Sequence, residues 1–317
     1  MVDVITLGEA MAVFTPLQRG PLRSAGLFQR GMGGAEANFA VGVSRLGLGA
    51  RYLTLLGDDE FGRYILHELR GDGVDTSGVR LVSGRPTGLN VKEVREGGGG
   101  KTFYYRAGSA ASTMSPADLS PDQFAGARWL HVSGVFGAVS ESCRATVYRA
   151  IELAREAGLG IALDPNIRLK LWDEATARSV LLDLMGRVDY VFSGAEEGRI
   201  LFGTDDPDRI ARLALQLGPH TVVVKEGDRG ATGYTQGGQR VHVPAFRVVV
   251  ADTVGAGDAW AAGFTVGMLQ GLGLEESIRF GNAAGALVCS VAGDIEGLPA
   301  WDELQAFLGR SPSPVDR

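Results

Sequence analysis

Cysteine, histidine and lysine are all scarce in this chain of 317 residues. The two cysteines, Cys143 and Cys289, lie far apart in the sequence, which excludes a disulfide framework and a CxxC metal motif. The four histidines form no HxxxH pair, so no zinc-binding helix is indicated. Only four lysines stand against 27 arginines, which draws attention to Lys225 at the end of an apolar run.

Long hydrophobic runs are also missing, since no segment is apolar for about 18 residues, as a membrane-spanning helix requires. The chain begins with a strand-like run, residues 2–8, rather than with a signal peptide, so we expect a cytoplasmic protein. A net charge of −6 and a pI near 5.4 argue against general nucleic-acid binding. We therefore expect neither a membrane nor a nucleic acid among its partners.

Glycine is abundant, with 47 residues, about twice the usual ~7% share. This favours tight turns and close approach of the backbone to a ligand. Short apolar runs alternate with longer runs of helical period, which predicts an α/β fold with a mostly parallel sheet and helices on both faces. The predicted strands are 2–8, 51–56, 128–133, 160–164, 190–193 and 221–225. The predicted helices are 35–46, 61–72, 141–157, 174–185, 208–217, 257–270 and 275–291.

Two segments break this alternation, residues 10–33 and 79–106, because their strand-like pieces have no helix between them. Within the second, residues 87–95 and 101–106 flank a Gly97–Gly100 turn and predict a hairpin. We interpret both segments as a small β-rich lid inserted in a single domain that spans residues 1–317.

The stretch Asp252–Asp258 (DTVGAGD) is the most informative part of the sequence. It follows a strand-like run, Val248–Ala251, and precedes a helix-like run, so the N–H groups of Gly255, Ala256 and Gly257 are predicted to bind a phosphate. A carboxylate there would repel that phosphate unless Asp258 accepts a proton from the attacking hydroxyl. The alternative is a structural turn in which Asp258 is an ordinary residue of a helix N-terminus.

A second glycine cluster, Gly31–Asn38, opens another predicted helix. It indicates either close contact between backbone and ligand or a flexible loop. Two other glycine patterns are rejected. Lys101-Thr102 is not a phosphate-binding loop, because Arg95 replaces the required glycine, and Trp260 breaks a dinucleotide-binding pattern.

Several polar side chains follow predicted strands. Tyr104 and Arg106 end the second lid strand, and Arg168 follows the strand 160–164, where open α/β sheets bind ligands. Two arginines facing one crevice indicate an anionic substrate group. Glu196 follows another strand and is either a water-mediated Mg²⁺ ligand or an acid at a helix start.

These motifs together resemble the ribokinase-like (PfkB) carbohydrate kinases. Asp252–Asp258 is similar to the C-terminal signature of that family, and Gly33–Asn38 with Arg45–Gly47 is similar to the N-terminal one. The paired motifs are specific, and the resemblance extends over nearly the whole chain. It implies a ribokinase-like, Rossmann-like domain with a β-sheet lid.

Within the family, the chain most resembles the kinases of 2-keto-3-deoxygluconate, through Gly8-Glu9, Phe103–Ala110, Asp164–Arg168, Leu171-Trp172 and Gly293–Gly297. This implies ATP- and Mg²⁺-dependent phosphorylation of the 6-hydroxyl of that sugar acid. A neutral sugar would leave Arg106 and Arg168 without partners in a closed site.

The resemblance also implies a role for each matching position. Asp258 is the general base, and Gly255, Ala256 and Gly257 form the anion hole. The residues implied to bind the sugar acid are Gly33, Gly34, Asn38, Tyr104, Arg106 and Arg168. The residues implied to bind the nucleotide are Ser193, Lys225, Gly227, Gly230, Gly255, Gly257 and Asn282. The chain departs from the family at Ser193, which replaces the asparagine of an Asn-x-x-Glu motif ending at Glu196.

Three alternatives stay open at this point. A fructokinase or ribokinase would use the same Asp258 chemistry on a neutral sugar. A kinase of another acid sugar, such as the galactonate epimer, would keep the arginines. A non-catalytic sugar-binding regulator would bind without turnover. The resemblance further implies a homo-oligomer and leaves activation by a monovalent cation open.

Overall fold

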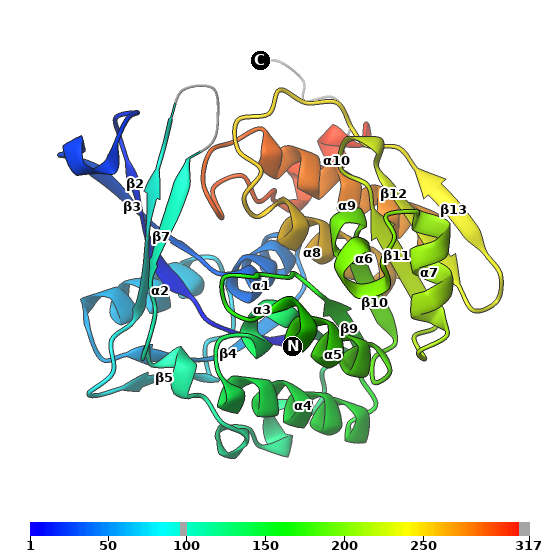
Figure 1. The fold of residues 1–317 in the computed structure, drawn as a ribbon, viewed down its shortest axis with the longest axis horizontal. Helices are drawn as coiled ribbons and strands as arrows, with labels where there is room; N and C mark the ends of the chain where they lie inside the picture. The colour runs from blue at the N-terminus through cyan, green and yellow to red at the C-terminus, as the bar shows by residue number, and fades with distance from the viewer. Residues whose placement is uncertain (96–99, 311–317) are drawn as a thin grey trace.

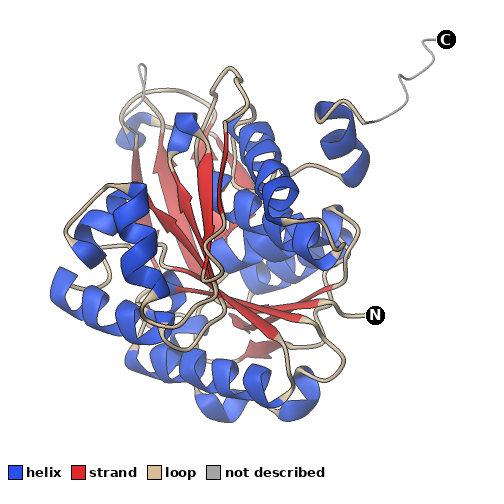
Figure 2. Cartoon of the chain, turned by 90° about the vertical axis from the view of Figure 1, so that its right-hand side faces the viewer, coloured by secondary structure: helices blue, strands red, loops and turns tan. Residues whose placement is uncertain are grey.

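The structure is a computed structural model that describes residues 1–95 and 100–310, and its body is a nine-stranded sheet between layers of helices (Figure 1, Figure 2). The strand order is β13-β12-β11-β10-β9-β8-β1-β4-β5. The strands are β1 Val4–Leu7, β4 Ala50–Gly57, β5 Val79–Val82, β8 Trp129–Ser133, β9 Gly160–Asp164, β10 Tyr190–Gly194, β11 Thr221–Lys225, β12 Ala231–Thr235 and β13 Arg240–Val243. From β11 to β5 all neighbouring strands pair in parallel. The β11–β12 and β12–β13 pairs are antiparallel. The predicted α/β fold with a mostly parallel sheet is confirmed.

The strands are apolar on both faces because helices cover both faces. In β11, Val222 and Val224 pack into one buried cluster, while Val223 points to the opposite one. The same period-2 alternation separates Val4 from Ile5 in β1. The sheet therefore divides the core into two apolar layers.

Each layer of the core is closed by its own helices. On one face lie α1 Ala35–Arg45, α2 Glu60–Gly71, α8 Ala256–Leu269, α9 Leu274–Cys289 and α10 Trp301–Phe307. On the other lie α3 Gly134–Gly137, α4 Glu141–Glu156, α5 Glu174–Met185, α6 Ala195–Phe202 and α7 Pro207–Leu215. None of the helices in the described residues has the length and hydropathy needed to cross a membrane.

A separate four-stranded sheet stands beside this body and is the lid (Figure 1). Its strands are β2 Met11–Pro16, β3 Phe28–Gly33, β6 Gly88–Glu93 and β7 Lys101–Tyr105, in the order β3-β2-β6-β7. The predicted hairpin is confirmed, since β6 and β7 pair antiparallel. Most of its predicted glycine turn, residues 97–99, lies outside the described residues.

Two predictions about strands are wrong. Residues 79–82, assigned to the lid, form β5, which extends the main sheet by parallel pairing with β4. The run Val248–Ala251, predicted as a strand before the phosphate motif, is an extended loop in which Val249 is 89% exposed. The sheet ends at β13, so this run has no neighbouring strand and is held by hydrogen bonds to Cys289 at the end of α9.

Parallel pairing places the carboxyl ends of five strands along one edge of the sheet. Glu9, Ser133, Asp164, Ser193 and Lys225 lie at or just beyond the ends of β1, β8, β9, β10 and β11. In open α/β sheets this edge is where ligands bind.

Candidate active site

The phosphate motif lies at the start of α8. Gly255 precedes the helix with a φ of +79°, in the left-handed region that favours glycine. A Cβ on Gly255 would lie 2.6 Å from the carbonyl oxygen of Asp294, so close packing also requires glycine there. The N–H group of Ala256 donates to the carbonyl oxygen of Thr253 at 3.3 Å. The other N–H groups of the first turn have no partner within the helix, which leaves them available to an anion.

Asp258 lies in this first turn and is half-buried. The side-chain amide of Asn38, from the first turns of α1, donates a hydrogen bond of 2.8 Å to its Oδ2 atom. Burial raises the pKa of Asp258 to about 7, and the nearby carboxylate of Asp164 adds to the shift. The hydrogen bond from Asn38 and the charges of Arg168 and Lys225 lower it in part. A carboxyl group with this pKa can accept and release a proton near neutral pH.

Lys225 brings a positive charge to the same turn. Its ammonium donates to Asp164 Oδ2 at 2.7 Å, and it lies 3.8 Å from where a Cβ of Gly257 would be. Although burial disfavours the charged form, the carboxylates of Asp164 and Glu197 raise the pKa of Lys225. Lys225 therefore stays protonated beside the anion-binding turn.

The acid that faces this cluster is Glu197 rather than the predicted Glu196. Glu196 is exposed, whereas Glu197 accepts hydrogen bonds from the N–H groups of Gly194 (2.7 Å) and Ile167 (3.0 Å). Burial and the charge of Asp164 raise the pKa of Glu197. The sequence offered two adjacent acids, and only the helix geometry distinguishes them.

Ser193 is fully buried at the end of β10. Its hydroxyl hydrogen-bonds only to the carbonyl oxygen of Gly194, at 3.2 Å, among the described residues. The side chain of Ser193, predicted to bind the nucleotide, therefore has no exposed atom.

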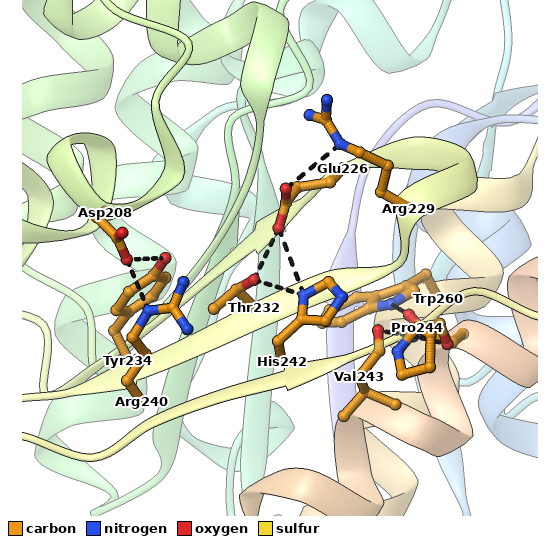
Figure 3. Close-up of polar contacts among 11 residues, drawn as sticks. Asp208, Glu226, Arg229, Thr232, Tyr234, Arg240, His242, Val243, Pro244 and Trp260 are labelled. Carbon is orange, nitrogen blue, oxygen red and sulfur yellow. Dashed lines mark hydrogen bonds and ion pairs between the residues drawn. The ribbon is translucent and has the colours of Figure 1, made fainter.

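Gly227 and Gly230 shape the turn between β11 and β12 and have φ angles of +63° and +104°. A Cβ on Gly230 would lie 2.1 Å from the carbonyl oxygen of Val243. Beside this turn, Thr232 donates to Glu226 at 2.7 Å and contacts the His242 ring (Figure 3).

Asn282 is buried in α9 and uses both ends of its amide within the protein. Its oxygen accepts from the Trp260 indole at 2.8 Å, and its nitrogen donates to the carbonyl oxygens of Val243 (2.9 Å) and Pro244 (3.1 Å). Figure 3 shows Trp260, Val243 and Pro244 converging at this point. The amide of Asn282 is therefore not free to contact a nucleotide, and such a contact would come from the residues that Asn282 holds in place, Val243 and Pro244.

The second glycine cluster brings α1 close to β1. Gly34 has a φ of +149°, and a Cβ there would lie 2.2 Å from the carbonyl oxygen of Glu9. A Cβ on Gly33 would lie 2.8 Å from the carboxyl carbon of Asp294. Gly33 therefore packs closely against the side chain of Asp294, and Gly34 packs closely against the backbone of Glu9.

Arg106 points into the same region, but it already has a partner. Its guanidinium forms an ion pair with Glu9, which also accepts a hydrogen bond of 2.6 Å from Ser109. The expectation that a neutral sugar leaves both arginines unpaired is therefore wrong for Arg106, because Glu9 follows β1 into the site.

Arg168 differs from Arg106. It is exposed in the loop after β9, and it makes no ion pair with the residues that the structure describes. Its charge lowers the pKa of Asp258, so the guanidinium acts electrostatically on that carboxyl group. Tyr104 from the lid reaches the same loop, with the Lys170 ammonium 6.0 Å from its ring centroid.

The inner face of the lid contributes residues that the sequence prediction omitted. Alternation along β6 places Gly88, Asn90 and Lys92 on one face, and pairing across the hairpin adds Tyr104. Eleven buried side-chain polar atoms have no hydrogen-bond partner in the described structure, and three of them belong to this region: Asn38 Oδ1, Asn90 Oδ1 and Arg106 Nε. Buried polar atoms are normally satisfied, so these three indicate a polar ligand between α1 and the lid.

Glu36, in the first turn of α1, was also omitted from the predicted site. It is 1% exposed, accepts a hydrogen bond from Ser133, and packs against Gly8, where a Cβ would lie 2.2 Å from its Oε2 atom. Burial raises the pKa of Glu36 to about 8, opposed by the Ser133 hydrogen bond and reinforced by Asp258. Glu36 therefore remains mostly uncharged at neutral pH beneath the carboxylate of Asp258.

Comparison with known families places this geometry in context. The profile described as "pfkB family carbohydrate kinase" matches residues 1–301. The chain is 40% identical over 314 residues to 2-dehydro-3-deoxygluconokinase of Bacillus subtilis (strain 168), covering 96% of this chain and 95% of that protein. It is 35% identical over 312 residues to the 2-dehydro-3-deoxygluconokinase of Thermoproteus tenax, covering 97% and 94%.

A third relative is named for a different substrate. Fructokinase-1 of Oryza sativa subsp. japonica is 35% identical over 319 residues, covering 96% of this chain and 97% of that protein. Similarity to both kinds of kinase leaves the choice between an acid and a neutral sugar to the site itself.

Solved structures of similar fold agree with the family match. A PfkB protein from Polaromonas sp. JS666 superposes with a TM-score of 0.89 at 38% identity, covering 96% of this chain and 100% of that one. A putative ribokinase II from E. coli in complex with ATP and Mg²⁺ superposes with a TM-score of 0.91 at 26% identity, covering 98% and 100%.

Replacing Glu36 by glutamine should flatten the dependence of stability on pH. Because its folded pKa of about 8 exceeds the ordinary value of 4.5, its stabilising contribution is full below pH 4.5 and is lost as pH rises through 8. Glu36→Gln keeps the shape and cannot ionise, so at pH 8 it should be more stable than the wild type by roughly 2–4 kcal/mol. Urea unfolding at pH 5 and pH 8 measures this. Equal loss of stability in both proteins would contradict an uncharged Glu36.

Proposed function

The chain belongs to the pfkB family of carbohydrate kinases, and from this premise we propose that it transfers the γ-phosphate of ATP to the 6-hydroxyl of 2-keto-3-deoxygluconate (2-dehydro-3-deoxygluconate). The observation that carries the proposal is the placement of Asp258, held by Asn38 at the start of α8. It joins a proton acceptor and an anion-binding turn at one point. Phosphoryl transfer from a nucleotide to an alcohol needs both.

On the phosphate side, Asp258 accepts the proton of the sugar hydroxyl while that oxygen attacks the γ-phosphorus. The bond from phosphorus to the bridging oxygen of ADP breaks as the new bond forms. The N–H groups at Gly255, Ala256 and Gly257 stabilise negative charge on the transferring group. Lys225, kept cationic by Asp164, offsets further negative charge at the same turn.

Asp164 and Glu197 are the residues suited to hold Mg²⁺, by way of water molecules. Within the described residues, no set of three or more His, Cys, Asp or Glu side chains could hold a metal ion by itself. Mg²⁺ commonly keeps several waters and takes its other ligands from the substrate phosphates. When bound it neutralises phosphate charge.

On the sugar side, Arg168 is the residue that favours an acid. Its guanidinium has no ion-pair partner in the described structure and lies near Asp258. Arg106 offers its unpaired Nε atom, and Asn38 and Asn90 offer amide oxygens to hydroxyl groups. Gly33 and Gly34 allow the sugar to approach the backbone, and Tyr104 closes the pocket from the lid. Closure excludes water, so that the sugar rather than water is phosphorylated.

A fructokinase is the second candidate, and two observations favour it. The fructokinase of Oryza sativa is as similar as one of the sugar-acid kinases. Glu9 already pairs with Arg106, so a neutral sugar leaves only Arg168 without a partner.

Changing Asp258 to asparagine should abolish the base and keep ATP binding. We expect kcat to fall by at least ~10²-fold, because general base catalysis typically contributes that factor. In the wild type, kcat/KM should fall as pH drops through about 7, because Asp258 becomes protonated. Steady-state kinetics from pH 5.5 to 8.5 with an ATP-binding assay tests both. Near-normal turnover by the variant would remove the general-base assignment.

A substrate panel with Arg168→Ala should separate the two candidate substrates. Loss of one or two charge-assisted hydrogen bonds, about 1.5–3 kcal/mol each, should raise KM for the keto acid by at least ~10-fold. The KM for fructose should change little. ADP release is measured with 2-keto-3-deoxygluconate, its galactonate epimer, fructose and ribose. Arg199→Ala serves as the control, because Arg199 pairs with Asp205 on the surface. Equal effects on acid and neutral sugars would contradict an acid substrate.

We also propose that the chain forms a homo-oligomer through the lid. Phe28, Phe103 and Tyr105 are exposed on it, and exposed aromatic side chains of this kind are typical of an interface. Light scattering after size exclusion should give a multiple of 33.4 kDa. A mass of one chain at micromolar concentration would contradict the proposal.

A further inference from the structure

Lys92 joins the lid to the phosphate-binding region. It lies in β6, on the inner face of the lid, and its side chain is 12% exposed. Its ammonium forms an ion pair with Asp294 at 2.8 Å and lies 3.9 Å from a carboxylate oxygen of Asp252. Asp252 begins the phosphate motif, so one lid side chain contacts both acids.

Asp294 lies between the two glycine motifs. Its carboxyl group is beside Gly33, and its carbonyl oxygen is beside Gly255, at 2.8 and 2.6 Å from the respective Cβ positions. Its loop is closed by Glu296, which accepts hydrogen bonds from the N–H groups of Asp294 (2.9 Å) and Ile295 (3.0 Å). Any movement of Asp294 therefore reaches both Gly33 and Gly255.

The charge balance of this cluster depends on Lys92. In the described part of the chain it is the only cation that forms an ion pair with Asp252 or Asp294. Burial raises the pKa of Asp294, and Lys92 opposes this shift, so the ion pair favours the ionised form. Without Lys92, two carboxylates would face an incoming polyanion with no compensating charge.

We propose that Lys92 is a positioning residue for phosphoryl transfer: its ammonium fixes the Asp294 loop against Gly255 and couples the position of the lid to the anion-binding turn. The inference rests on the proposed function in that the turn receives the γ-phosphate of ATP. Lys92 acts through Asp252 and Asp294, and it does not need to touch the nucleotide.

The test compares Lys92→Met with Lys101→Met, because Lys101 is the other lysine of the same hairpin and is exposed. Lys92→Met should lower kcat by at least ~10-fold, the scale expected when a buried ion pair loses one member. Lys101→Met should leave kcat within ~2-fold of the wild type, as for a surface charge. Hydrogen exchange should rise in peptides covering residues 88–93 and 252–258 of Lys92→Met alone.

Two further measurements distinguish charge compensation from simple packing. Adding Asp294→Asn to Lys92→Met removes the uncompensated carboxylate, so the double variant should recover activity relative to Lys92→Met. Methylammonium at tens of millimolar should partly restore kcat of Lys92→Ala and should not change the wild type. A packing role predicts neither recovery nor rescue.

The inference is overturned if Lys92→Met keeps kcat within ~2-fold of the wild type, or if Asp294→Asn only adds a further loss. If Lys92→Met does not fold, the double variant carries the test, and its failure to fold also overturns the inference. Each measurement uses whichever sugar the wild type phosphorylates. A neutral substrate would therefore contradict the proposed acid substrate and leave the inference about Lys92 open to the same test. If no sugar is turned over, hydrogen exchange still decides the role of Lys92.

Discussion

The carboxylate of Asp258 lies at the N-terminus of α8, where the proposed reaction brings phosphate charge, and the electrostatics of this site follow from that placement. Asp258 is held by an amide, which fixes its position without neutralising it. The acids around it are paired or uncharged: Asp164 binds Lys225, Asp294 binds Lys92, and Glu36 is buried as a protonated group. In the proposed reaction this balance limits the repulsion of an incoming polyanion, and an unpaired acid at any of these positions would oppose ATP binding.

The fold produces this arrangement of charged side chains because parallel strands place their carboxyl ends at one edge of the sheet. The parallel strands deliver Glu9, Asp164 and Lys225 to one edge from positions more than two hundred residues apart. The long α8 and α1 pack on the same face of the sheet and bring Asn38 to Asp258. The lid then adds Asn90 and Lys92 from outside the sheet. Because the framework is rigid and doubly covered, small adjustments of the lid and the loops decide the shape of the pocket.

Periodicity in the sequence predicted the parallel sheet and most of its helices, and the two glycine motifs are segments that the structure brings together through the hydrogen bond from Asn38 to Asp258. Antiparallel β12 and β13 were omitted, because they follow β11 without the helix that marks a parallel crossover. The prediction of a strand at Val248–Ala251 was wrong, because β propensity alone cannot show whether a neighbouring strand exists. Side-chain partners were the least predictable feature: neither the Glu9–Arg106 pair nor the choice of Glu197 over Glu196 has a local signal.

The pairing of Arg106 with Glu9 affects how the substrate preference of this kinase could change during evolution. An incoming carboxylate competes with an acid that the protein already provides, so an acid sugar gains only the difference between two similar partners. Under the proposed function, discrimination between acid and neutral sugars then depends mainly on Arg168, which is exposed in the loop after β9. Because Arg168 is exposed, replacing it would alter this discrimination without disturbing the folded core.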